Sequence, residues 1–191
     1  MGNSGSRVLE ACDMKTAFRP ACVAVAVAVV LTAGCTTPTP APTAQMTVPF
    51  NAGDVAWSRA SGTATVEGGA AIPGAGDVRR TCAGGEAQLF PAGPYAAEMM
   101  RIVFGSDVRG FAPVGSSRYP TNIAADFAST VRRIGCDSEG HFRFDGVPAG
   151  RWFVFSNVIF RSASGEAPQG GALMQRIDVA EGARAIVLLA P

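Results

Sequence analysis

Lysine and histidine are nearly missing from this sequence, and basic residues do not outnumber acidic residues beyond residue 34. Lys15 is the single lysine and His141 the single histidine, and beyond residue 34 thirteen arginines are matched by thirteen acidic residues. A protein that holds nucleic acid would be expected to carry a basic run or stripe, and no such run is present. We therefore expect no nucleic-acid partner.

Motifs of catalytic and metal sites are also missing. The chain contains no G-x-S-x-G, no P-loop and no G-x-G-x-x-G, and its Gly-Gly pairs have no phosphate-binding context. Asp137, Glu139 and Asp145 could be imagined as calcium ligands, but they do not have the EF-hand spacing, and acidic residues beside glycine are ordinary turn residues. The sequence predicts no enzyme, no metal and no cofactor.

The longest hydrophobic run lies near the N-terminus and is too short to span a membrane. It extends from Ala21 to Leu31 and follows the basic residues Lys15 and Arg19, whereas a spanning helix needs roughly 20 apolar residues. A basic start followed by a short apolar core and small residues is typical of an export signal. We expect residues 1–34 to be a cleaved signal peptide, with Met14 as the more natural start.

The end of this segment resembles the bacterial lipobox. Residues 31–35 read LTAGC, with small residues directly before Cys35. The resemblance implies that Cys35 is acylated, which would attach the protein permanently to a membrane because each buried CH₂ contributes about 0.8 kcal/mol. Ordinary cleavage and an uncleaved signal anchor are the alternatives. Thr36, in place of Asp, implies an exported protein on the periplasmic face of the bacterial outer membrane.

Proline and threonine dominate the segment after this cysteine. Residues 35–46 cannot bury a core, so we expect them to form an extended tether. The remaining residues, 47–191, suit one domain. Short β-like runs separated by glycine or proline predict an all-β antiparallel sandwich. The expected strands are 63–72, 86–90, 101–104, 127–134, 141–144, 151–161, 173–179 and 184–189.

Two segments interrupt the strand pattern. Proline at a first helical position, followed by Ala, Glu and Met, predicts one or two helical turns over Pro94–Met100. Residues 105–122 show no clear period, and loops of that length are more often functional or mobile. Methionine is common in adaptable contact surfaces, so the helical segment and the residues directly after it offer a possible partner surface. The alternative is that this segment is a helical turn that caps one open end of the sandwich. The residues of the possible surface are Tyr95, Met99, Met100 and Phe104.

Residues 135–161 carry the strongest turn and strand pattern. Turns are predicted at 137–140 and 147–150, and Gly140 can take the positive φ that such a turn requires. The following run, 152–160, is almost wholly apolar, as in a central strand of a sandwich. The pattern predicts a β-hairpin whose second arm, Trp152 included, is buried.

The strand between these turns alternates with a period of two. Phe142 and Phe144 share one face, and His141 and Arg143 share the other. We expect the phenylalanines in the core and His141 facing solvent, without a catalytic role.

From residue 137 the sequence D-S-E-G-H-F-R-F-D-G-V-P-A-G-R-W resembles the signature D-x-x-G-x-F-x-F-x-x-V-P-A-G-x-Y of carboxypeptidase regulatory-like domains, with Trp152 in place of the usual Tyr. The resemblance implies a prealbumin-like, immunoglobulin-like β-sandwich of the kind found in bacterial surface and secreted proteins. It does not imply peptidase activity, because the zinc-ligand motifs such as H-x-x-E are missing. The motif residues are Asp137, Gly140, Phe142, Phe144, Pro148 and Gly150.

Two functions follow from these observations. The first is a non-enzymatic, membrane-anchored envelope lipoprotein that acts as an interaction or structural module for an unknown envelope protein. The second is a carbohydrate- or peptidoglycan-binding module that uses an edge of the sandwich and residues 105–122. Sugar binding usually needs exposed Trp or Tyr rings. The chain offers Trp57, Trp152, Tyr95 and Tyr119.

Cys82 and Cys136 are the two cysteines that remain beyond Cys35. Export would place them in an oxidising compartment, where an even pair in a β domain is typically bridged. Two lone cysteines without neighbouring histidines cannot complete a zinc site, and a redox pair would be expected as C-x-x-C. We predict a disulfide between them.

Overall fold

The computed structural model describes residues 43–191, apart from 75, 77, 116–117 and 162–166. The predicted signal peptide, Cys35 and most of the predicted tether lie outside these residues. The folded region begins earlier than the predicted Thr47, because strand β1 (Thr43–Gln45) pairs in parallel with β6 (Tyr119–Thr121) and Met46 is buried. Among the helices of the described residues, none has both the length and the apolar composition needed to cross a bilayer.

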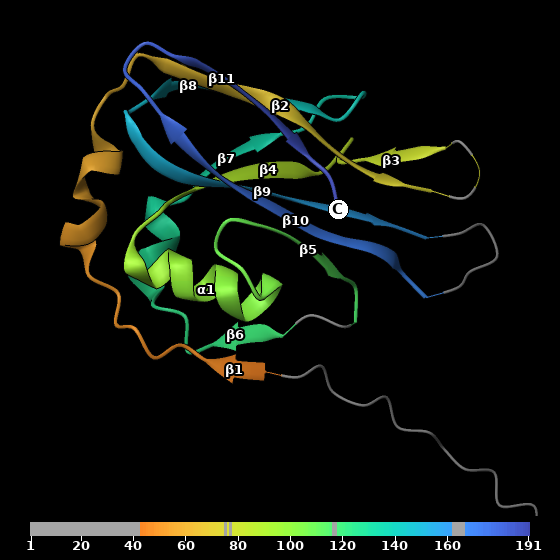
Figure 1. Ribbon diagram of the computed structural model, residues 1–191, viewed down its shortest axis with the longest axis horizontal. Helices are drawn as coiled ribbons and strands as arrows, with labels where there is room; N and C mark the ends of the chain where they lie inside the picture. The colour runs from red at the N-terminus through yellow and green to blue at the C-terminus, as the bar shows by residue number, and fades with distance from the viewer. Residues whose placement is uncertain (1–42, 75, 77, 116–117, 162–166) are drawn as a thin grey trace, which may run out of the picture. The chain divides into compact units, whose positions relative to one another are not determined.

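Two β-sheets face each other and form the predicted all-β sandwich (Figure 1). The larger sheet is antiparallel throughout, and the smaller sheet contains one parallel pair, β11 with β2. The larger sheet has the order β5 (Arg109–Pro113), β10 (Gln169–Val179), β9 (Gly150–Phe160), β4 (Glu86–Pro91) and β7 (Arg132–Gly135). The smaller sheet consists of β11 (Arg184–Leu189), β2 (Ala64–Pro73), β3 (Arg79–Thr81) and β8 (His141–Val147).

The inner core lies between these two sheets. Phe142 and Phe144 of β8 are buried and His141 and Arg143 are exposed, as the period-two pattern predicts. Trp152 of β9 is also buried, and its indole N–H donates to the carbonyl of Pro148 at 3.1 Å. The sequence therefore correctly predicts which face of β8 enters the core and that Trp152 is buried.

A second core covers the outer face of the larger sheet. Helix α1 (Pro94–Phe104) and the 3-10 helix η2 (Ala125–Thr130) pack on this face, where Figure 1 shows them with β1 and β6. Pro94 occupies the first turn of α1, and Gly105 ends the helix in the left-handed conformation with φ 70°. The buried residues of this core are Met46, Phe90, Tyr95, Ala96, Met99, Met100, Phe127, Phe153 and Met174.

Three predicted elements differ from the structure. Residues 101–104, predicted as a strand, are the last turn of α1, which is longer than one or two turns. Residues 127–130, predicted as the start of a strand, lie in η2, and β7 begins only at Arg132. Residues 105–122, which show no period in the sequence, contain β5 and β6. Short apolar runs occur in both helices and strands, so their sequence does not distinguish the two.

The predicted hairpin of residues 135–161 is also wrong. Strand β8 pairs with β2 in the smaller sheet, whereas β9 pairs with β4 and β10 in the larger sheet. Residues 148–149 therefore connect the two sheets. Gly150 is required at the end of this connection, because a Cβ there would lie 2.3 Å from the ring of Trp57 in the 3-10 helix η1 (Ala52–Arg59).

Candidate functional site

A groove of about 320 Å³ opens where α1 ends over the outer face of the larger sheet. Its strand residues come from β4, β5, β6, β9 and β10, and its helical residues come from the second half of α1. Ala112 of β5 lies opposite Ala172 of β10, and Ala172 lies opposite Asn157 of β9. Because these alanine side chains are small, the sheet surface stays open beside them. Nearer the start of α1, larger side chains fill the space between the helix and the sheet.

The helical wall and part of the sheet wall of the groove are apolar. Met99, Met100, Val103 and Phe104 line it from α1. Phe104 packs edge-on against Phe155 of β9, with 6.2 Å between ring centroids and 69° between ring planes. Because both rings are held by packing, this wall is formed before any ligand arrives.

Polar groups lie on the rim and the adjacent strands. Asn157 is exposed and Tyr119 of β6 is 50% exposed, while Gln88 of β4 is half-buried. Gln88 lies opposite Phe155, and Asn157 is two residues beyond Phe155, so the two amides are on the same face of the sheet. The Gln88 amide nitrogen donates to the carboxylate of Glu86, and its carbonyl oxygen is able to accept from a ligand.

No Asp, Glu, Lys or Arg lines the groove as far as the described residues show. The groove therefore offers apolar contact, two amides and one phenol, but no fixed charge. Such a lining suits an uncharged ligand, because a buried charge without a partner is costly.

The residues predicted as a partner surface are mostly core residues. Tyr95, Met99 and Met100 are buried, and only Phe104 is half-buried. The Tyr95 hydroxyl accepts from the backbone N–H of Ala124 at 2.8 Å, which fixes its ring against the loop before η2. This arrangement corrects the prediction of an exposed surface: the side chains hold α1 on the sheet, and three of the four predicted residues, all but Tyr95, also line the groove.

The four candidate sugar-binding rings differ in their exposure. Trp152 and Tyr95 are buried, and the sequence predicted this for Trp152. Trp57 is half-buried and packs edge-on against Trp152, with 5.0 Å between ring centroids. Only Tyr119 has half of its surface exposed, and it lies at the groove. The sequence identified Tyr119 as a candidate ring but could not show that it lies beside α1.

Charged residues gather instead on the outer face of the smaller sheet. A shallow hollow of about 700 Å³ is lined there by side chains that include Glu67, His141 and Arg143. Glu67 accepts from Arg143 at 3.0 Å and from Arg184 at 2.7 Å. Arg143 also donates to Asp145 at 2.9 Å, so two arginines and two carboxylates form one ion-pair network on this face.

The turn motif explains the local structure around His141. The backbone N–H groups of His141 and Glu139 donate to the Asp137 carboxylate at 2.8 and 2.9 Å, which lowers the pKa of Asp137. Gly140 has a φ of 87°, as the turn requires. Asp145 instead binds Arg143, whose guanidinium lowers the pKa of Asp145. Within the described part of the chain, no three His, Cys, Asp or Glu residues come close enough to hold a metal.

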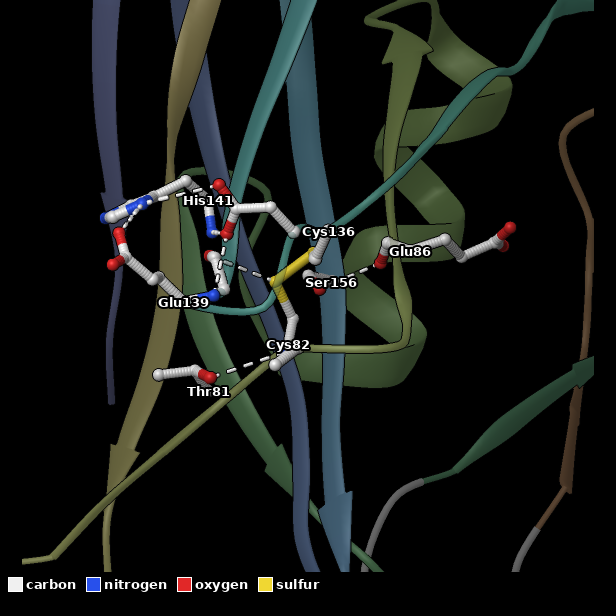
Figure 2. Close-up of a disulfide and its surroundings, with 10 residues drawn as sticks. Thr81, Cys82, Glu86, Cys136, Glu139, His141 and Ser156 are labelled. Atoms are coloured by element: carbon white, nitrogen blue, oxygen red, sulfur yellow. Dashed lines mark hydrogen bonds and ion pairs between the residues drawn. A yellow bond between two sulfur atoms is a disulfide. The ribbon is translucent and has the colours of Figure 1, made fainter.

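The predicted disulfide between Cys82 and Cys136 is confirmed (Figure 2). Cys82 follows β3 of the smaller sheet, and Cys136 follows β7 of the larger sheet, so the bond joins the two sheets. The Cys136 N–H donates to the carbonyl of Gly85 at 2.9 Å, and Ser156 of β9 donates to the carbonyl of Glu86 at 2.9 Å. The Gly85 N–H in turn donates to the carbonyl of Cys82 at 2.8 Å, so both ends of the cross-link are held beside the start of β4.

Comparison with known proteins supports the fold and does not name a family. No protein-family model matches the chain, and no curated protein matches it. A solved structure from Pseudomonas aeruginosa, described as a "putative carbohydrate binding protein", superposes with a TM-score of 0.63 at 19% identity. The match covers 74% of this chain and 97% of that one. At this identity the likeness defines the class of protein by architecture alone, a β-sandwich.

Proposed function

We propose that this protein is an exported, lipid-anchored, non-enzymatic module of the bacterial envelope that binds carbohydrate in the groove beside α1. The observation that carries the proposal is the half-exposed ring of Tyr119 beside the amides of Asn157 and Gln88. Aromatic faces pack against the C–H faces of sugars, and amides bind their hydroxyl groups. The groove is also near the lower end of the volumes usual for small-ligand sites.

The structural neighbour adds support of a weaker kind. Its description as a carbohydrate-binding protein agrees with the chemistry of this groove. A shared fold does not by itself transfer a function, so the proposal depends on the residues of the groove. It retains the predicted membrane anchor and gives the interaction module a glycan as its partner.

Replacing Tyr119 by alanine is expected to weaken glycan binding about tenfold, or ~1.4 kcal/mol, because the substitution removes the exposed aromatic face. Tyr119→Phe keeps that face and should retain most of the affinity. Binding of the purified protein to a glycan array, followed by calorimetry on the best glycan, measures both effects. Ile186→Ala, an exposed apolar substitution on β11 of the other sheet, is the matched control. Absence of binding to every glycan on the array contradicts the proposal.

Replacing Cys35 by serine is expected to abolish lipid attachment. The thiol is the group that the lipobox resemblance assigns to acylation, and serine cannot form the thioether. Labelling of cells with a palmitate analogue, followed by gel analysis, checks the result, and the unchanged protein is the positive control. Continued labelling of the Cys35→Ser variant contradicts the lipoprotein proposal.

A protein partner is the second candidate, favoured by the exposed side chains of Ile186 and Leu188, which are 71% and 72% accessible on β11. Exposed apolar side chains grouped on one strand are typical of interaction surfaces. A photo-crosslinking residue at 188 that captures an envelope protein, when one at 119 does not, would favour this candidate over the glycan.

A further inference from the structure

We infer that the groove is specific for a neutral sugar that carries an N-acetyl group, such as a 2-acetamido-hexose. This inference rests on the proposed function and adds the chemical class of the ligand. Its starting point is that the groove lining, within the described residues, contains no charged side chain. A uronic acid, a sialic acid or a phosphorylated sugar would place its charge there without a counter-charge, at considerable cost in free energy.

The apolar wall is larger than an unsubstituted sugar requires. Val103 and Phe104 are half-buried on α1, Phe155 is half-buried on β9, and Ile159 is 56% exposed at the other side of the groove. Hydroxyl groups placed against this wall would lose water without gaining hydrogen bonds. The methyl group of an acetamide fills the same space and removes apolar surface from water.

The two amides complement the remainder of the acetamido group. An acetamide has one N–H donor and one carbonyl acceptor. The Gln88 carbonyl oxygen accepts from the ligand N–H, while one N–H of the Gln88 nitrogen donates to Glu86 and holds the amide in place. The exposed Asn157 amide nitrogen donates to the ligand carbonyl. Tyr119 then packs on the sugar ring itself, whether or not the sugar is acetylated.

A purely apolar ligand fits this arrangement less well. An acyl chain would cover the α1 wall, but it would leave the Gln88 carbonyl on the sheet without a hydrogen-bond partner when water is displaced. A glycan without the acetyl group would pair with the amides through hydroxyls but leave the wall of Val103 and Phe104 unfilled. The N-acetyl sugar is the ligand that meets both parts of the lining.

The test compares two sugars that differ mainly at one substituent. Tri-N-acetylchitotriose and cellotriose have the same β-1,4-linked backbone, and the first carries a 2-acetamido group where the second carries a hydroxyl. We expect the full-length protein, measured by isothermal titration calorimetry, to bind the acetylated trimer at least tenfold more tightly. Chitotriose without acetyl groups should bind no better than cellotriose, because it lacks the methyl group that fills the apolar wall.

Two variants separate recognition of the acetyl group from recognition of the ring. Asn157→Ala should reduce the preference for the acetylated trimer to threefold or less, and Tyr119→Ala should weaken both neutral trimers by the same factor. Asn157 is exposed, so an unchanged melting temperature will show that the variant is folded.

The possible failures are distinguishable. Equal affinity for the acetylated trimer and cellotriose overturns the N-acetyl inference and leaves carbohydrate binding intact. A preference that survives Asn157→Ala overturns the placement of the acetamido group against Asn157 in this groove. Absence of binding to these trimers and to every glycan on the array overturns the proposed function and the inference with it.

Discussion

Replacing Phe144 by alanine is expected to lower the free energy of unfolding by about 3 to 5 kcal/mol, the range usual for truncating a buried phenylalanine. The side chain is 4% exposed in the inner core, lies opposite Val66 of β2, and packs edge-on against Phe142 at 6.1 Å between ring centroids. Truncation leaves a cavity that neighbouring strands cannot close without shifting. Urea unfolding followed by circular dichroism measures the loss, with the same dependence of the free energy of unfolding on urea concentration used for both proteins.

His141→Ala is the matched control on the same strand. Its side chain is on the opposite face of β8, 62% exposed, and its Nδ1 lies 3.7 and 3.5 Å from the carboxylates of Asp137 and Glu139. Exposed pairs of this kind contribute little, so we expect a change within about 0.5 kcal/mol. Equal losses for Phe144→Ala and His141→Ala would show that the two faces of β8 are assigned the wrong way round.

Removing the disulfide is expected to cost roughly 4 kcal/mol of stability, because Cys82 and Cys136 close a loop with a sequence separation of 54. That is a large share of the 5–15 kcal/mol or so typical of a folded protein. The melting temperature should fall by about 10 °C. Calorimetry of the purified protein before and after reduction, and of the Cys82→Ala/Cys136→Ala double variant, measures the effect.

Mass measurement after thiol alkylation supplies the control for this prediction. Unreduced protein isolated from the cell should take up no alkyl group at either cysteine, and reduced protein should take up two. Uptake of two groups without reduction would mean that the bond does not form in the cell. An unchanged melting temperature after complete reduction would instead contradict the expected stabilisation.

The alternation of β8 and the cysteine pair are the features that the sequence predicts best. Phe142 and Phe144 occupy one face because a strand places alternate side chains on opposite sides, whichever strand lies beside it. For the same reason the pattern could not show that β8 and β9 belong to different sheets. A hairpin and a connection between sheets both bury Phe144 and Trp152 in a common core.

The groove could not be predicted, because its lining combines residues that are distant in the sequence. Gln88, Met99, Tyr119 and Asn157 belong to four elements, and only the packing of α1 on the sheet brings them together. The strand predicted at residues 101–104 would also have removed its helical wall. The length of residues 105–122 and their lack of a clear period gave one useful signal, since loops of that length are more often functional.

Strand β9 limits how this protein can change its ligand during evolution. Its alternate residues belong to different cores: Trp152 and Val154 lie in the inner one, and Phe153 packs in the outer one. A substitution of any of these three residues therefore affects stability, whereas Asn157 and Ile159 of the same strand are exposed at the groove and lie outside both cores. Tyr119 and Val114, which are 50% and 36% exposed, lie at the groove but outside both cores. Related proteins should therefore differ in glycan preference through these exposed groove positions, while the core residues of β9 remain nearly constant.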